Sequence, residues 1–316
     1  DGKLSGVRLT HDPNVYSQGT SSNVRFEHCT FNGISSQMAP VPEYSSIVGR
    51  YNYCIRMGNT DQTCWLRHCK FRNIGWDKDG NRQCTMPQTS GLIYPKGQMK
   101  VEYCEIDRIC VGGEGIFNNK GGYVSGKYDA GHTDAYTYQV RNVYIRDVEQ
   151  IPASVRTDGG GTFEPRGIFF TTHCYNSVLE NVKIENAITR NGVFCEHYNA
   201  GVVDNLSIKD VTVKNLSVNE SGGFASAVFI IGSTQGAPPY ADIQLDNVDA
   251  ELVSTPRNKA SLLRIYDSNG SYESTVDVVE VTNARLDVSG SGVGNAILLE
   301  VDDNMDDANS PTPTGI

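Results

Sequence analysis

The strongest constraint in the sequence is a short pattern that recurs eight times between residues 26 and 286. Each copy reads apolar, any residue, polar turn-former, small apolar, any residue, apolar, as in Phe26-Glu27-His28-Cys29-Thr30-Phe31. The chain therefore repeats one structural unit about every 36 residues. The small apolar position is occupied in turn by Cys29, Cys69, Cys104, Val148, Val182, Val211, Val248 and Ala284.

The period inside each copy decides the fold class. Apolar residues alternate with a period of two, which excludes helical repeats, and a propeller blade would need four antiparallel strands in each unit. Strand and turn units stacked in register remain, as in a parallel β-solenoid. We predict an all-β fold, a parallel β-helix of about eight or nine coils over residues 1–303, followed by an acidic, Pro- and Thr-rich linker or tail over residues 304–316.

The repeat resembles that of the right-handed parallel β-helix superfamily, the pectate-lyase-like fold, over about residues 20 to 302. The resemblance implies a right-handed solenoid whose partner is a polysaccharide or surface glycan, located outside the cell or on a virion surface. Two functions follow. One is an enzyme that cleaves the polysaccharide as a glycosidase or lyase, with hydrolysis favoured over β-elimination. The alternative is a non-catalytic viral tail, tailspike or receptor-binding module, for which a homotrimer is expected.

Several conspicuous residues of the repeat are interpreted as structural. His28 and His68 share a column with Tyr103, Asp147, Asn181, Asp210, Asn247 and Asn283, which is expected at a strand corner where polar side chains bond the backbone. Cys29, Cys69 and Cys104 share a column with Val and Ala, so we expect reduced, buried thiols rather than a disulfide between coils.

A second strand in each coil suggests an aromatic ladder. If Ala135, Ile168, Val193 and Val228 point inward, strand alternation turns the next residue of each of four consecutive coils outward, namely Tyr136, Phe169, Phe194 and Phe229. Exposed aromatic rings in a row indicate one of three things: loops that cover them, a surface for stacking sugar rings, or a subunit interface.

The candidate catalytic residues lie beside this ladder. The segment Gly131-His132-Thr133-Asp134-Ala135 resembles the strand opening of some β-helix carbohydrate-active proteins, and His132 and Asp134 fall on one side of a strand. We expect Asp134 to be the main carboxylate, Glu196 its partner in an inverting arrangement, and His132 to tune its protonation. Further candidates for substrate binding, or for the base and cations of a lyase, are Tyr138, His173, Arg166 and Arg190.

Charge and composition exclude other partners. The net charge of −10 argues against nucleic acid, and no apolar run approaches the length of a membrane span. Asp77-Lys78-Asp79-Gly80-Asn81 resembles half of a calcium loop without its distal carboxylate, so we interpret it as a turn and expect no metal or cofactor. The sugar, its linkage and the choice between the two functions stay open at this point.

Overall fold

The computed structural model describes residues 24–33, 53–56, 63–76, 91–94, 98–111, 115–119, 137–150, 167–171, 174–197, 203–218, 227–233, 240–255, 259–267, 278–290 and 295–303. Within these ranges the chain forms nineteen strands and no helix, and every strand pair is parallel. Accordingly, no helix in the described ranges is long and apolar enough to cross a membrane. The predicted all-β parallel solenoid is confirmed.

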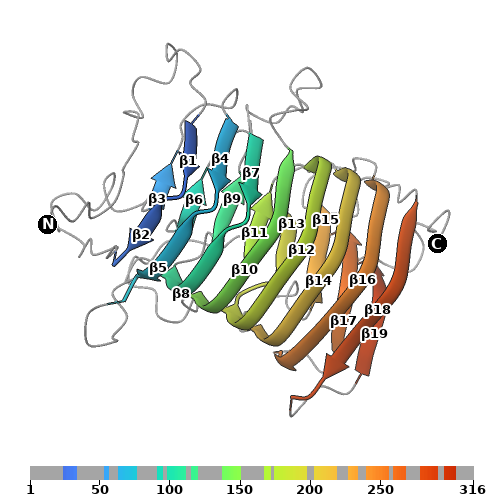
Figure 1. Ribbon diagram of the computed structural model, residues 1–316. Coiled ribbons are helices and arrows are strands. Elements are labelled where there is room, and N and C mark those ends of the chain that lie inside the picture. Colours follow the sequence, from blue (N-terminus) through green and yellow to red (C-terminus); the bar gives the residue numbers. More distant parts are fainter. Residues whose placement is uncertain are drawn as a thin grey trace, which may run out of the picture.

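The strands form two sheets that run the length of the solenoid, in sequence order from blue to red (Figure 1). The first follows the path β1 (Val24–Glu27), β4 (Thr63–Arg67), β7 (Gln98–Glu102), β10 (Tyr138–Gln150), β12 (Cys174–Thr189), β14 (Val203–Val218), β16 (Tyr240–Ser254) and β18 (Val279–Val288), with β2 (Thr30–Asn32), β5 (Lys70–Ile74) and β8 (Glu105–Val111) beside it. The second contains β3 (Tyr53–Arg56), β6 (Gly91–Tyr94), β9 (Phe117–Asn119), β11 (Phe169–Thr171), β13 (Phe194–His197), β15 (Ala227–Ser233), β17 (Lys259–Asp267) and β19 (Asn295–Asp303).

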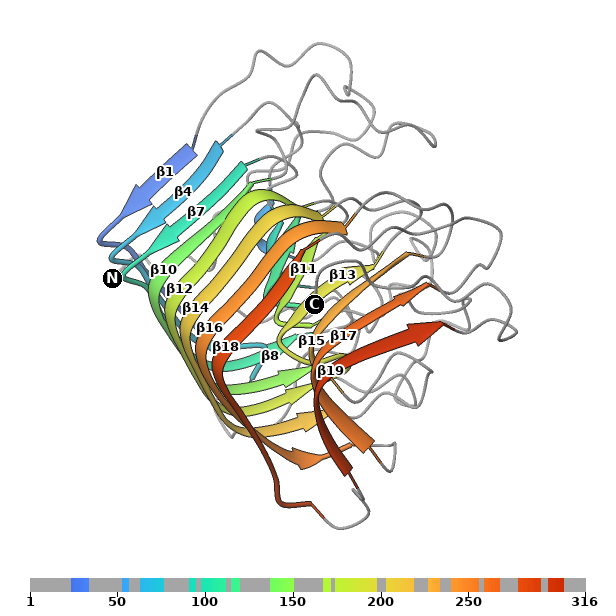
Figure 2. The same cartoon turned by 90° about the vertical axis from the view of Figure 1, so that its right-hand side faces the viewer.

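The long strands of the first sheet bend at regular points (Figure 2). Sixteen described non-glycine residues have a left-handed backbone, with φ between 44° and 58°, and twelve of them are Asn or Asp. They recur every five residues, as at Asn176, Asn181 and Asn186 in β12. Asn and Asp tolerate this conformation because their short side chains form local hydrogen bonds, so each one turns the strand by a corner without a glycine.

Corner residues of successive coils bond to one another. Asn181 donates to the side-chain oxygen of Asn142 at 2.7 Å, and Asn247 donates to Asp210 at 2.6 Å. A second column continues the pattern, with Asn186 donating to Asp147 and Asn215 to Asn186, both at 2.9 Å. The corner position predicted for the polar column of the repeat is confirmed, whereas the bonds described above join side chains of successive coils and not a side chain to the backbone.

The position of the fourth repeat differs from the prediction. Backbone pairing places Arg141 opposite Glu102 and Glu180, so the residue in the column of Tyr103 and Asn181 is Asn142. Asp147 belongs to the next corner, five residues later. The small apolar position of this coil is therefore Val143 and not Val148. The prediction failed here because both corners carry the same sequence pattern.

The predicted number of coils is also corrected. Four consecutive coils are of full length, because β10, β12, β14 and β16 are continuous strands of 13, 16, 16 and 15 residues. The earlier coils are divided at the corner into shorter strands such as β1 and β2, and β18 contains only 10 residues. The solenoid thus has about four full turns and not eight or nine uniform coils.

The core lies between the sheets and is continuous along the axis. Phe117, Phe169, Phe194 and Phe229 are paired in register in the second sheet, and each is fully buried. The rings of Phe117 and Phe169 stack with centroids 5.1 Å apart. An aromatic ladder therefore exists, but it is inside the solenoid.

Candidate functional site

The outer corner of the first three coils carries stacked rings. His28 and His68 lie 4.8 Å apart between ring centroids and are inclined by 4°, while His68 and Tyr103 lie 5.0 Å apart and are inclined by 15°. The rings stack because they occupy one column of a parallel ladder, where neighbouring coils are one strand spacing apart. Each inner ring face is covered by the next ring, so this column offers few free faces along its length.

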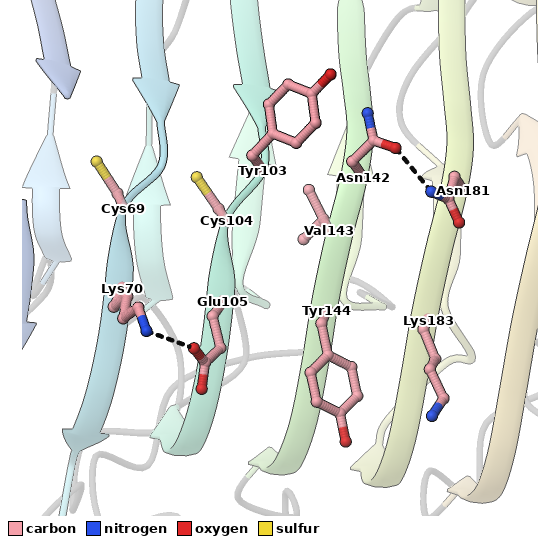
Figure 3. A pocket seen from close by; sticks show the side chains of 10 residues that line it. All are labelled: Cys69, Lys70, Tyr103, Cys104, Glu105, Asn142, Val143, Tyr144, Asn181 and Lys183. Atoms are coloured by element: carbon pink, nitrogen blue, oxygen red, sulfur yellow. Dashed lines mark hydrogen bonds and ion pairs between the residues drawn. The ribbon is translucent and has the colours of Figure 1, made fainter. Parts of the chain in front are cut away.

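The stack ends at Tyr103, and a groove opens beyond it (Figure 3). The next residue in the column is Asn142, whose amide is much smaller than a phenol ring. The groove has a volume of about 320 Å³ and is open to solvent. Tyr103, which is 50% exposed, forms one wall. The remaining lining residues are Cys69, Lys70, Cys104, Glu105, Asn142, Val143, Tyr144, Asn181 and Lys183.

The charged groups of the groove are paired. Glu105 accepts from Lys70 at 3.1 Å and from Arg72 at 2.7 Å. Burial raises the pKa of Glu105, but the hydrogen bonds from Arg72 and Lys70 outweigh that effect, so its pKa is lowered. This carboxylate is ionised at neutral pH. It can accept a hydrogen bond from a hydroxyl group, but it cannot donate a proton to a leaving group.

The opposite side of the groove is organised around Glu185. Lys183 pairs with Glu185 at 2.6 Å, and the hydroxyl of Tyr144 donates to the same carboxylate. These two bonds, from Lys183 first and Tyr144 second, lower the pKa of Glu185. The bond to Glu185 raises the pKa of Tyr144, so the phenol stays protonated at neutral pH. The groove thus presents hydroxyl, amide and ammonium groups with little net charge.

Two thiols lie at the apolar base of the groove. Cys69 and Cys104 are buried, and the thiol of Cys104 donates to the carbonyl oxygen of Glu102 at 3.3 Å. The hydrogen bond to Cys69, together with burial, raises the pKa of Cys104, so this group stays a thiol. Cys29, Cys69 and Cys104 are free thiols, as the reduced interpretation predicted, although Cys29 is only partly buried; Cys64, Cys110 and Cys174 are free as well.

On the sheet surface that carries the groove, side chains of opposite charge alternate along the solenoid axis. One column alternates in sign from coil to coil, through Glu27, Arg67, Glu102, Arg141 and Glu180. Arg67 lies 3.7 Å from Glu27 and 3.8 Å from Glu102, and Arg141 lies 3.0 Å from Glu180. Such a surface provides no continuous basic path for a polyanion, which needs clustered, unpaired cations.

The predicted outward aromatic ladder is wrong for the residues that the structure describes. Phe169, Phe194 and Phe229 have 0% exposure, so none of them offers a ring face to a ligand, and the separate candidate Tyr138 is buried as well. Tyr138 begins β10 in the first sheet, and the true neighbour of Phe169 in the second sheet is Phe117. The alternation was counted from Ile168 and Val193, but these residues precede the strands and are buried as well.

Two further predicted residues lie in described ranges. Arg190 directly follows β12, is fully buried, and donates its backbone N–H to the side-chain oxygen of Gln150 at 2.8 Å. A fully buried guanidinium does not meet a substrate at the surface, which corrects its predicted role. Glu196 lies in β13, where its backbone pairs with those of Thr171 and Ile231.

The other predicted site residues fall outside the described ranges. They are His132, Asp134, Tyr136, Arg166 and His173, together with the half calcium loop at residues 77–81. Within the described ranges, no group of three or more His, Cys, Asp or Glu side chains is placed to hold a metal ion.

The groove itself was missed in the sequence, although its signal was present. Tyr103 was correctly assigned to the corner column with His28 and His68. The predicted column already changed from the ring of Tyr103 to a small side chain, although it placed Asp147 where the structure has Asn142. A change in side-chain size along a solenoid column is therefore the feature that could have located the groove.

Comparisons with known proteins add no relative. No protein-family model matches the chain, and neither a curated protein nor a solved structure matches it significantly. Inference about its function therefore starts from the groove beside Tyr103.

Proposed function

We propose that this protein is a glycan-binding β-solenoid and that the groove beside Tyr103 holds a sugar unit. The observation that carries the proposal is the half-exposed ring of Tyr103 as a wall of a groove that also contains Asn142 and Asn181. Binding sites for small ligands combine apolar and aromatic walls with a few placed polar groups in volumes of roughly 300 to 1,000 Å³. The groove lies at the small end of that range, which suits one or two sugar rings.

The lining residues supply the chemistry that a sugar needs. One face of a pyranose ring is apolar and can pack on the phenol ring of Tyr103. Hydroxyl groups of the sugar can accept from Lys70 and Lys183 and can donate to Glu105, which is ionised. Because Lys70 and Lys183 each already pair with a carboxylate, we expect a neutral or weakly charged glycan rather than a polyuronate.

The same proposal includes the handedness of the solenoid and the superfamily to which it belongs. Connections between parallel strands of one sheet are right-handed in about 98% of cases, which supports a right-handed solenoid. The parallel stacking and the corner columns are compatible with the pectate-lyase-like superfamily. Its members act on extracellular polysaccharides or on surface glycans bound by virions, and we propose the same setting here.

Cleavage of the glycan is the second candidate, and it rests on the segment around His132 and Asp134. Hydrolysis needs one carboxyl group that keeps its proton at neutral pH, usually through a raised pKa. Glu105 and Glu185 both have lowered pKa values, so the groove beside Tyr103 is suited to binding. A polysaccharide panel tests the enzyme: new reducing ends report cleavage, and the ultraviolet absorbance of unsaturated uronates reports elimination alone.

Replacing Tyr103 with alanine is expected to weaken glycan binding by about 1 to 3 kcal/mol, a range taken from the stacking of bases on aromatic side chains. The loss arises because the sugar would no longer have a flat apolar wall to pack on. The dissociation constant of a glycan first identified on an array, measured by titration calorimetry, checks the expected change.

His28→Ala is the matched control. It removes an exposed ring from the same column, two coils away from Tyr103 and outside the lining of the groove. Glycan affinity should stay within error of the wild type in this variant. Equal losses in both variants would show that the ring column as a whole matters and not the groove, and unchanged affinity in Tyr103→Ala would remove the basis of the proposal.

A further inference from the structure

The C-terminal end of the solenoid exposes side chains that are buried in every full coil. Leu263 and Leu299 occupy the interior column of the second sheet that continues from Phe229, yet Leu263 is fully buried whereas Leu299 is only partly buried. In the first sheet Leu245 is buried, whereas its partner Val281 is only half-buried. Among the described strands, β18 and β19 are paired on one side only. Figure 1 shows both at the red end of the molecule. Over the described residues, this end face therefore carries apolar side chains, and its strand edges have no partner among the described strands, an arrangement that invites strand addition.

The N-terminal end of the same chain has the matching cross-section. Strand register from coil to coil places Phe26 in the column of Val281, and Phe31 in the column of Leu286. Phe26 is itself only partly buried at the free side of β1. A second copy placed at the end of the first would thus set apolar columns on apolar columns and continue both sheets with parallel pairing.

Charge supports the same pairing. Arg25 at the N-terminal end and Glu280 at the C-terminal end share one column, and both are exposed. In a head-to-tail contact these two side chains would face each other with opposite sign. The neighbouring columns would bring Thr282 to Glu27 and Arg285 to Thr30, so none of these three contacts opposes like charges.

We propose that the C-terminal end face of one molecule stacks on the N-terminal end face of a second copy. The contact is heterologous, since it joins two different faces of the same chain, and its axis is that of the solenoid. Such contacts do not close, so they produce open chains that lengthen with protein concentration. The proposal is independent of glycan binding, because the groove lies between the two end faces on the side of the solenoid.

The test uses one blocking variant for each face. Val281→Lys places a charge on the C-terminal face, and Phe26→Lys places one on the N-terminal face. Sedimentation velocity of the wild type should show a mass that rises with concentration, while each variant alone should stay monomeric. Mixed in equal amounts, the two variants should form a 1:1 dimer, because each retains the face that the other needs.

A charge variant covers the case in which either lysine variant fails to fold, as judged by its circular dichroism. Glu280→Arg sets like charges opposite Arg25 and should weaken association about two- to fivefold, the range of an exposed ion pair. Gln244→Arg is the control, since Gln244 is exposed in the same column one coil inward. A wild type that stays monomeric, a closed oligomer of fixed size, unmixed monomers in the variant mixture, or equal effects of the two charge variants would each overturn the proposal.

Discussion

Phe194→Ala is expected to lower the free energy of unfolding by about 3 to 5 kcal/mol, the range for removing a large aromatic side chain from a core. Phe194 is fully buried, pairs in register with Phe169 and Phe229, and contacts Tyr138 edge-on at 6.5 Å between ring centroids. Its neighbours are held by strands on both sides, so the surrounding coils cannot collapse into the cavity. Urea unfolding followed by circular dichroism measures the loss.

Two variants separate burial from other effects of the substitution. Phe194→Leu keeps most of the apolar volume and should cost less than half as much as alanine. Tyr103→Ala removes a ring that is half exposed and should change stability by about 0.5 kcal/mol or less. If Phe194→Ala costs no more than Tyr103→Ala, the ring does not belong to the core, and the outward ladder expected from the sequence would return as the better description.

The fold class was predictable because each repeat contains the residue types that a solenoid corner requires. Cys29, Cys69 and Cys104 are small enough for a tight interior corner, and the polar residue before each one adopts the left-handed conformation. Those two constraints act at the same place in every coil. They therefore leave a periodic trace in the sequence even though the loops between the strands vary in length.

The register of one coil was not predictable from the same periodic sequence pattern. Corners follow one another every five residues, so Asn142 and Asp147 present equivalent local patterns. Only pairing with the coils on either side decides which corner aligns, and this pairing is a long-range property. The error replaced Asn142 by Asp147 beside Tyr103, and because both side chains are small it changed the identity of this lining residue and not the end of the ring stack.

The sequence also did not reveal which side chains of the second sheet point into the core. Alternation predicts the direction of a side chain only inside a strand, and β11 and β13 begin at Phe169 and Phe194. Ile168 and Val193 lie just before them and are also buried, so counting from either residue gives the wrong face. A short apolar run at a corner thus contains no information about which residue points inward.

A glycine beside this corner explains how the second sheet is held so close to its neighbours. Gly192 has φ of +73°, and a Cβ atom there would lie 2.2 Å from the carbonyl oxygen of Ala227 in the next coil. The adjacent N–H of Val193 donates to the carbonyl oxygen of Val228 at 2.7 Å, so the two coils cannot separate without losing that bond. The backbone of one coil therefore occupies the space that a side chain would need.

Gly192→Ala is expected to destabilise the protein by about 2 to 5 kcal/mol, which combines the cost of a left-handed alanine with that of overpacking against backbone. Gly33→Ala is the control, because Gly33 has a similar φ of +68° but a Cβ atom there would meet no neighbour within 4 Å. It should show only the conformational cost, about 1 to 2 kcal/mol. Unfolding free energies of the two variants in urea give the difference directly. Equal losses would mean that the close approach of the coils at Gly192 does not exist, and Phe194, the member of the buried phenylalanine column two residues later, would then lose the contact that fixes its register.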